Sequence, residues 1–150
     1  MTNDTIAGIR AFNRFYTTVI GVTNHHILES DYSLTEARAM FEVHNNPGMT
    51  ARELKAELQV DEGYLSRLIT KLVKNKILLK KQSKEDKRIF ALELSENGKK
   101  TFSRLNNRSS EDIARLIDHL SSAEKAELLS HLDRIKTLLT KNEQHGHGHQ

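Results

Sequence analysis

Cationic side chains are concentrated in one short stretch of this 150-residue sequence. Between residues 71 and 88, eight lysines and arginines accompany only two acidic residues, Glu85 and Asp86. The eight are Lys71, Lys74, Lys76, Lys80, Lys81, Lys84, Lys87 and Arg88. Contacts from such groups to the phosphates of a nucleic acid supply affinity and salt dependence but little sequence information. The stretch is therefore a candidate backbone-binding surface.

The overall charge of +3 conceals this concentration. Residues 1–46 carry a net charge of −2, residues 47–104 carry +6, and residues 105–150 carry −1. A basic middle between two slightly acidic ends indicates that the middle meets a polyanion. A solvated lysine-rich face is the alternative that charge alone leaves open.

Side chains that can read bases come just before the basic stretch. Arg67 is the first candidate for a bidentate guanine contact, worth about 1–3 kcal/mol of discrimination, with an ion pair to Glu62 or Asp61 as its alternative. Ser66 can bind a base or a phosphate, and Tyr64 can contact DNA or pack against a neighbouring helix. The candidate set on this helix is Glu62, Gly63, Tyr64, Ser66, Arg67, Lys71 and Lys74.

Three helices are predicted ahead of these residues. Apolar spacings of three and four predict an amphipathic helix from Asp4 to about Leu28. Capping boxes at Ser33–Glu36 and Thr50–Glu53 begin two more, and Pro47-Gly48 separates them. The buried stripe expected for the first of these two is Leu34, Ala37, Met40 and Phe41.

A helix-turn-helix unit and a hairpin follow. Asp61 can cap a helix whose Leu65, Leu68, Ile69, Leu72 and Val73 recur at helical spacing, directly after the short helix begun at Thr50. Apolar residues then alternate at Phe90, Leu92 and Leu94, which predicts a strand from Arg88 to Leu94. Leu78 to Ser83 can extend as its partner, with a polar turn at residues 84–87 between the two. The fold class expected is mainly α with a β wing: a winged helix-turn-helix between long terminal helices.

The C-terminal third is predicted to be helical again after Ser95. Polar residues at 106–110 allow a bend in this helix, and Ser121 caps a last helix with one apolar residue per turn. The histidine-rich tail, residues 145–150, has no means of packing and is expected to be disordered.

With these elements in place, the sequence resembles the MarR family of bacterial transcription regulators. The resemblance is carried by Asp86-Lys87-Arg88, then Leu92-Glu93-Leu94-Ser95, then Gly98, close to the family pattern Asp-x-Arg followed by Leu-Thr-x-x-Gly. Residues 9–16, 33–38 and 61–67 are similar to the MarR-like domain found ahead of some GNAT-type acetyltransferase domains. We expect this protein to lack the acetyltransferase domain.

The resemblance implies a homodimer that binds double-stranded operator DNA. Residues 1–144 would be one MarR-like chain, with residues 4–30 and 105–141 forming dimerisation helices and residues 33–100 the DNA-binding domain. Lys80, Lys81, Lys84, Lys87 and Arg88 would contact DNA from the wing. Arg88 would enter the minor groove, and Asp86 would orient Arg88 or brace the wing. Twofold symmetry predicts a pseudo-palindromic operator, and we expect repression.

A small-molecule effector is the signal that the resemblance suggests. Its pocket would lie between the dimer helices and the winged domain, lined by Phe12, Phe15, Tyr16, Met40 and His44, unless these residues belong to the core. Cysteine is absent, so thiol-based sensing and disulfides are excluded.

Other function classes have weaker support. No phosphate loop, Gly-x-Ser-x-Gly or Gly-x-Gly-x-x-Gly occurs, so an enzyme is not expected, and neither is a cofactor. A metal-responsive regulator using His25, His26, Glu29 and His44, with Glu42 nearby, is one alternative. A helical interaction module that does not bind DNA is another, but it would not need the basic hairpin.

The first residues and the length of the apolar runs indicate the cellular compartment of the protein. No apolar run approaches the ~18 residues of a membrane span, and the first residues lack a secretory signal. We therefore expect a cytoplasmic protein without a membrane partner.

Overall fold

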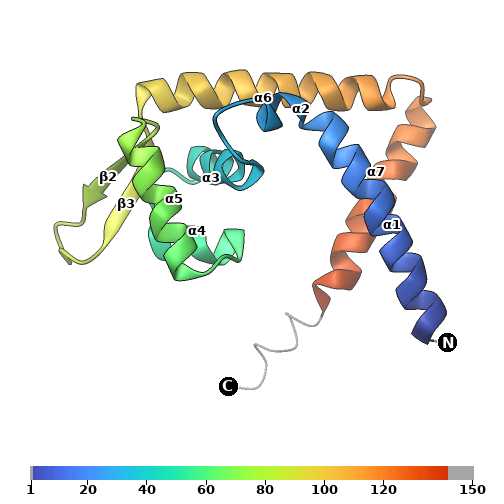
Figure 1. Cartoon of the computed structure of the whole chain (residues 1–150), viewed down its shortest axis with the longest axis horizontal. Coiled ribbons are helices and arrows are strands. Elements are labelled where there is room, and N and C mark those ends of the chain that lie inside the picture. Colours follow the sequence, from blue (N-terminus) through green and yellow to red (C-terminus); the bar gives the residue numbers. More distant parts are fainter. Residues whose placement is uncertain (1, 142–150) are drawn as a thin grey trace. The chain divides into compact units, whose positions relative to one another are not determined.

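The computed structural model describes residues 2–141, which belong to two units, Met1–Asp112 and Ile113–Gln150. Helix α6 begins in the first unit and ends in the second. The elements in Figure 1 are α1 (Thr2–Thr23), α2 (His25–Leu28), α3 (Leu34–Asn45), β1 (Met49–Thr50), α4 (Ala51–Leu58), α5 (Glu62–Lys74), β2 (Leu78–Gln82), β3 (Phe90–Leu94), α6 (Glu96–Ile117) and α7 (Ser122–Leu139). The mainly helical fold with a small sheet confirms the predicted winged helix-turn-helix.

Side-chain caps begin the helices where the sequence predicts them. Ser33 and Ser121 form complete capping boxes with Glu36 and Glu124. Asp61 Oδ1 accepts a hydrogen bond from the Tyr64 N–H at 2.7 Å. Each cap supplies an acceptor for an N–H that has no partner within the helix. Local chemistry thus sets where α3, α5 and α7 begin.

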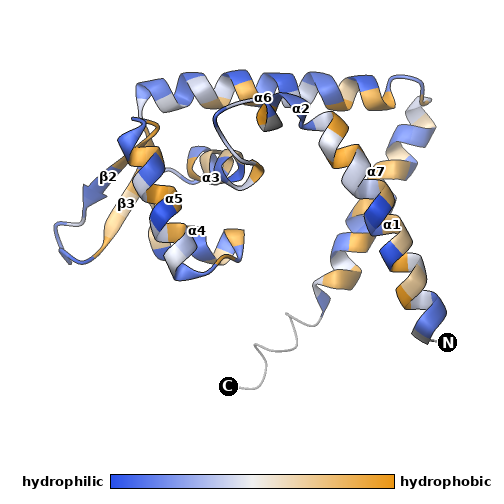
Figure 2. Ribbon diagram, in the orientation of Figure 1, coloured by the Kyte–Doolittle hydropathy of each residue, from blue (hydrophilic) through white to orange (hydrophobic). Residues whose placement is uncertain are grey.

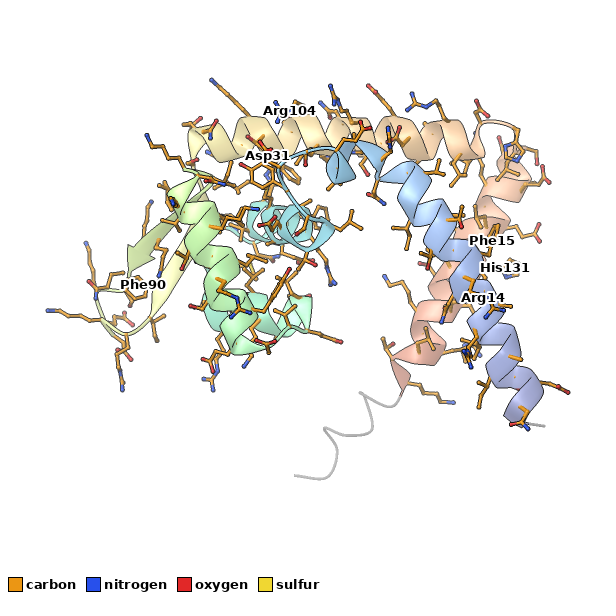
Figure 3. All side chains as sticks on the ribbon, viewed as in Figure 1. Arg14, Phe15, Asp31, Phe90, Arg104 and His131 are labelled. Atoms are coloured by element: carbon orange, nitrogen blue, oxygen red, sulfur yellow. The ribbon has the colours of Figure 1, made fainter. Side chains whose placement is uncertain are left out.

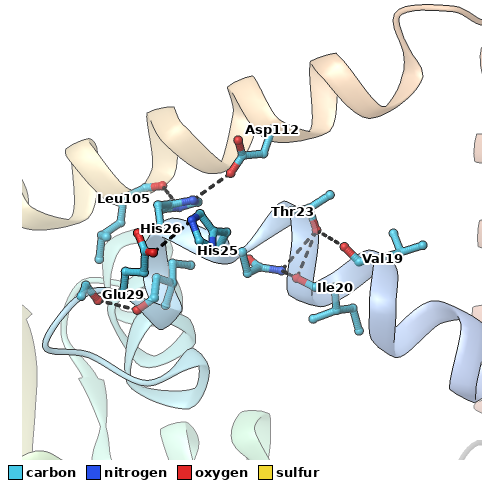
Figure 4. Close-up of polar contacts among 11 residues, drawn as sticks. Val19, Ile20, Thr23, His25, His26, Glu29, Leu105 and Asp112 are labelled. Carbon is cyan, nitrogen blue, oxygen red and sulfur yellow. Dashed lines mark hydrogen bonds and ion pairs between the residues drawn. The ribbon is translucent and has the colours of Figure 1, made fainter.

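The prediction of a single N-terminal helix from Asp4 to about Leu28 is wrong, because the helix breaks at Asn24. This residue has φ −118° and ψ 20°, outside the helical region, and it separates α1 from the short α2. The Asn24 side chain donates to the Ile20 carbonyl, and the Thr23 hydroxyl donates to the Val19 carbonyl (Figure 4). Such side-chain bonds compete with helical backbone pairing, which apolar periodicity does not reveal.

The sheet has three antiparallel strands in the order β1-β3-β2. The hairpin pairs Leu78 with Leu94 and Gln82 with Phe90, as the alternation predicts. Strand β1 was not predicted, because two residues are too short to show a period of two. It pairs Met49 with Leu92 after a turn in which Gly48 has φ +90°, a conformation that favours glycine.

The core of the first unit lies between α3, α4, α5 and the sheet. In α3 the predicted stripe is wrong in part: Met40 is buried, but Phe41 is 44% exposed, and Leu34 and Ala37 are only half-buried. The buried face of α3 differs from the predicted one because it includes a glutamate, and a pattern of apolar residues does not detect a buried carboxylate. The residues of this buried face are Glu36, Ala39, Met40 and Val43.

The motif around Gly98 fixes the start of α6 against the end of α5. A Cβ added to Gly98 would lie 2.1 Å from the Ile77 carbonyl oxygen, so only glycine fits this approach. Ser95 Oγ accepts from the Gly98 N–H at 2.9 Å and donates to the Lys76 carbonyl. The serine that stands for the more usual threonine therefore retains the helix cap.

Helix α6 runs unbroken through the polar residues 106–110, where a bend was allowed. Within the second unit, α7 buries none of its residues and exposes several leucines. Figure 2 shows apolar residues along the length of α1 and along the length of α7. None of the helices among residues 2–141 is long and apolar enough to cross a membrane. The tail predicted to be disordered, residues 145–150, lies outside the described residues.

Candidate nucleic-acid interface

Helix α5 buries one face and exposes the face predicted to read bases. Leu65, Leu68, Ile69 and Leu72 are buried, while Glu62, Gly63, Ser66 and Arg67 are exposed and Tyr64 is half-buried. Tyr64 packs against the core, as its alternative reading proposed. This exposed first turn is the N-terminal, positive end of the helix dipole, and the Asp61 carboxylate that caps α5 lies beside it.

Arg67 is available for contacts outside the chain. No ion pair or hydrogen bond of its side chain occurs within residues 2–141, so the alternative of pairing with Glu62 or Asp61 is not seen. A Cβ on Gly63 would lie 3.5 Å from Arg67 Nη1 and 3.4 Å from Asp61 Oδ1. The missing side chain at residue 63 thus leaves space beside the guanidinium.

The hairpin presents most of the other cations. Lys81 Nζ lies 2.8 Å from a Glu93 carboxylate oxygen on the paired strand, and Lys80 Nζ lies 4.8 Å from the Phe90 ring centroid. Figure 3 labels Phe90 on the hairpin, from which long side chains project into solvent. Lys84 and Lys87 are exposed in the turn, and neither has an ion-pair partner in the described part of the chain.

Arg88 is held by the acidic residue two positions earlier. Asp86 Oδ1 accepts from the Arg88 backbone N–H at 3.0 Å and from Nε at 3.1 Å, and Oδ2 accepts from Nη2 at 3.1 Å. The guanidinium bonds, followed by the backbone bond, lower the pKa of Asp86 from its ordinary value. The carboxylate therefore stays charged, and the Arg88 side chain is oriented while 89% exposed.

A hollow joins the exposed face of α5 to the hairpin. Its volume is about 430 Å³, and Glu62 and Ser66 line it from α5 while Lys80 and Arg88 line it from the wing. Arg52, at the start of α4, also lines it, although no motif in the sequence distinguishes this residue. The structure thus brings part of each predicted group to one surface, whereas Arg67 and Tyr64 line a separate hollow.

Lys71 and Lys74 lie differently on α5. Lys74 is exposed in the last turn and has no ion-pair partner among the described residues. Lys71 pairs with Glu36 of α3, with Nζ 2.9 Å from Oε2. Of the two, only Lys74 is left free of intramolecular pairing.

Residues 32–90, which contain α3, the helix-turn-helix and the turn of the hairpin, match the MarR family.

One protein to which this chain is similar is the HTH-type transcriptional regulator BilQ of Clostridium symbiosum, 32% identical over 89 residues. The match covers 59% of this chain and 62% of BilQ, so the chain spans about three fifths of the length of this relative.

Solved structures of MarR-type proteins share the fold. The complex of Streptococcus pneumoniae FabT with DNA has a TM-score of 0.79 at 18% identity and covers 91% of this chain and 98% of FabT. A cysteine-to-serine mutant of MarR from E. coli, complexed with operator DNA, has a TM-score of 0.74 at 20% identity. The match covers 90% of this chain and 97% of the MarR chain. At these identities the likeness shows the fold.

The five residues predicted to line an effector pocket are not brought together. Tyr16 lines a hollow of about 600 Å³ with residues of α2, α3 and α6, including Ile27, Phe41 and Phe102. Met40 is fully buried in the core, and His44 stacks on Phe102 at 4.3 Å between ring centroids. Phe12 and Phe15 are exposed on α1.

The histidines proposed as metal ligands have separate partners. His25 pairs with Glu29 at 3.1 Å, whereas His26 contacts the Asp112 carboxylate at 2.8 Å and the Leu105 carbonyl at 3.1 Å (Figure 4). No group of three potential ligand side chains suited to a metal ion occurs among residues 2–141. His26 instead connects α2 to α6.

Proposed function

We propose that this chain is a transcriptional regulator that binds double-stranded DNA through its MarR domain. The observation that carries the proposal is the hollow at which the exposed face of α5 meets Lys80 and Arg88 of the wing. The first turns of α5 would enter the major groove, with Arg67 and Ser66 reaching base edges. Lys84 and Lys87 would contact phosphates, and Arg88 would enter the minor groove.

We propose further that the regulator is a homodimer. Helix α1 leaves large apolar side chains exposed, among them Phe15 at 64%, and α7 leaves Leu129 and Leu138 exposed. Apolar faces of this extent are typical of a surface covered by a partner, and a second copy supplies the same faces. Sedimentation of the wild-type chain and of a Phe15→Glu/Leu138→Glu variant tests this. Dimer lost only in the variant supports the proposal, and a monomeric wild type contradicts it.

Twofold symmetry of the dimer leads to a pseudo-palindromic operator. Its half-sites would lie about one helical turn, 10–10.5 bp, apart. The test is enrichment of duplexes from a randomised library by the wild-type protein, followed by mobility-shift titration of the enriched sequence. Recovery of inverted half-sites supports the proposal. Binding to all duplexes alike, or to none, contradicts sequence-specific regulation and favours the interaction module.

Repression is the direction of regulation that we propose, because a bound dimer would occupy promoter DNA needed by polymerase. A reporter driven by a promoter that contains the enriched sequence should fall in expression when the protein is present. Activation of this reporter would contradict repression without affecting DNA binding.

We also propose that a small-molecule effector binds in the hollow of about 600 Å³ lined by Tyr16, Phe41 and Phe102. Its lining is mainly apolar, with Arg38, Glu42 and Asn106 as polar groups. This composition suits an organic ligand with a few polar atoms. A compound screen that scores release of the enriched duplex tests the effector, and a Phe41→Trp variant should specifically alter its hits.

A further inference from the structure

The ammonium group of Lys71 is paired within the chain, although its side chain is 45% exposed. Nζ lies 2.9 Å from Glu36 Oε2, donates to Glu36 Oε1 at 3.0 Å, and donates to the Asp31 carbonyl oxygen at 3.2 Å. It also lies 5.7 Å from the centroid of the Tyr32 ring. These contacts join α5 to the start of α3 and to the turn before it. Asp31 is labelled at that turn in Figure 3.

The partner of Lys71 is itself fixed. Glu36 is 6% exposed, and Oε1 also accepts the Ser33 backbone N–H at 2.8 Å as part of the capping box. Burial by itself raises the pKa of Glu36, but the Ser33 bond together with the hydrogen bond and charge of Lys71 lowers it overall. The carboxylate is therefore charged and is held by bonds from Ser33 and Lys71, which makes it a directional anchor.

The apolar residues of α5 cannot provide such an anchor alone. Contacts of Leu68 and Leu72 with the core are non-directional, so a directional bond at the helix surface adds to what they fix. Lys71 lies one turn after Arg67, and the two side chains line one hollow of about 150 Å³ with Glu36 and Tyr64. The Lys71–Glu36 pair consequently acts next to the side chain that would read a base.

We propose that Lys71 is a positioning residue for base reading by α5, and that it does not contact phosphate. The pair with Glu36 sets the rotation of α5 and hence where Arg67 and Ser66 meet the base edges. This inference rests on the proposed function. It revises the role that the basic stretch alone suggests for Lys71, because charge density does not distinguish a lysine facing solvent from one facing a buried carboxylate.

The test compares Lys71→Gln with Lys74→Gln, an exposed lysine one turn away on the same helix. Affinities for the enriched duplex and for a scrambled duplex are measured at several salt concentrations. Lys71→Gln should weaken binding to the enriched duplex about two- to thirtyfold, leave the scrambled duplex nearly unaffected and leave the salt slope unchanged. Loss of the Lys74 phosphate contact in both protomers of a dimer would instead reduce the slope by about 1.8 and weaken both duplexes.

Variants at Glu36 separate positioning from charge at the DNA. Glu36→Gln retains an oxygen for the Ser33 N–H but removes the charge that holds Lys71, so it should reproduce the loss of Lys71→Gln. The double variant should lose no more than either single variant. Lys71→Arg, which can still pair with Glu36, should recover much of the discrimination between duplexes. A purely structural role would lower the melting temperature without changing that discrimination.

Hydrogen exchange of the α5 amides provides a readout that requires no DNA. Exchange should rise in Lys71→Gln and Glu36→Gln but not in Lys74→Gln. A reduced salt slope in Lys71→Gln, unchanged discrimination, or unchanged exchange would overturn the inference while the wild type still enriches a sequence. Failure of the wild type to enrich any duplex would overturn the proposed function, and the inference with it.

Discussion

Asp86 holds the guanidinium of Arg88 through two hydrogen bonds of 3.1 Å, and a third bond, from the Arg88 backbone, fixes the turn itself. The cation is thus presented to solvent in a defined direction. Since Asp86 lies two residues before Arg88 in the hairpin turn, the arrangement depends on local sequence.

Arg88→Ala should weaken binding to the enriched duplex by about 1–3 kcal/mol and leave the dimer intact. Asp86→Asn should have a smaller effect in the same direction, because the cation is kept but loses its orientation. Mobility-shift titration beside sedimentation measures both quantities, with Lys99→Ala on α6 as a matched control. Unchanged affinity in Arg88→Ala would remove the wing from the DNA contacts.

Replacing both Lys84 and Lys87 with Ala should make the slope of log K against log salt shallower by about 3.6 for a bound dimer, since each of its four unpaired lysines would neutralise one phosphate. Lys81→Ala should change the slope less, because Lys81 already pairs with Glu93 at 2.8 Å. Titrations on the enriched duplex at four or more salt concentrations distinguish the slope of the double variant from that of Lys81→Ala. Equal slopes in all three proteins would contradict phosphate contacts from the turn.

Glu36 should make the stability of the fold depend on pH. Its pKa in the folded chain is lowered from the ordinary value of 4.5, so its contribution is complete above that value and is lost as pH falls through the lower folded pKa. Urea unfolding should therefore show wild type more stable than Glu36→Gln at pH 7. The gap should narrow below about pH 4.5. A gap that does not change with pH would show that the carboxylate charge is not responsible.

Gly98→Ala should destabilise the fold by about 1–3 kcal/mol or more, because the added Cβ would overlap the Ile77 carbonyl and nothing there can move cheaply. Gly8→Ala on α1 is the matched control, since a Cβ at Gly8 meets nothing within 4 Å. The control should be neutral or stabilising by about 0.5–1 kcal/mol. Thermal unfolding of both variants decides the comparison, and equal melting temperatures would contradict the close approach of α6.

Much of the fold could be predicted from the sequence because its signals are local. Ser33, Asp61 and Ser121 each begin a helix through a bond to a residue three positions on, so a short stretch of sequence contains the whole interaction. The hairpin and the Asp86–Arg88 pair are equally local. Strand β1 and the break at Asn24 were missed, because one is too short for a pattern and the other depends on two side chains that leave apolar spacing intact.

The sequence by itself determined the charge of the basic stretch, the helix starts, and the motif that ends in Gly98. Only the tertiary structure decided which cations remain free. It pairs Lys71 with Glu36, 35 residues away in sequence, and Lys81 with Glu93, while leaving Lys74, Lys84 and Lys87 without ion-pair partners in the described chain. The physical reason is that an ion pair forms only where the fold brings a lysine and a carboxylate close together in space. The order of residues along the chain does not give that distance.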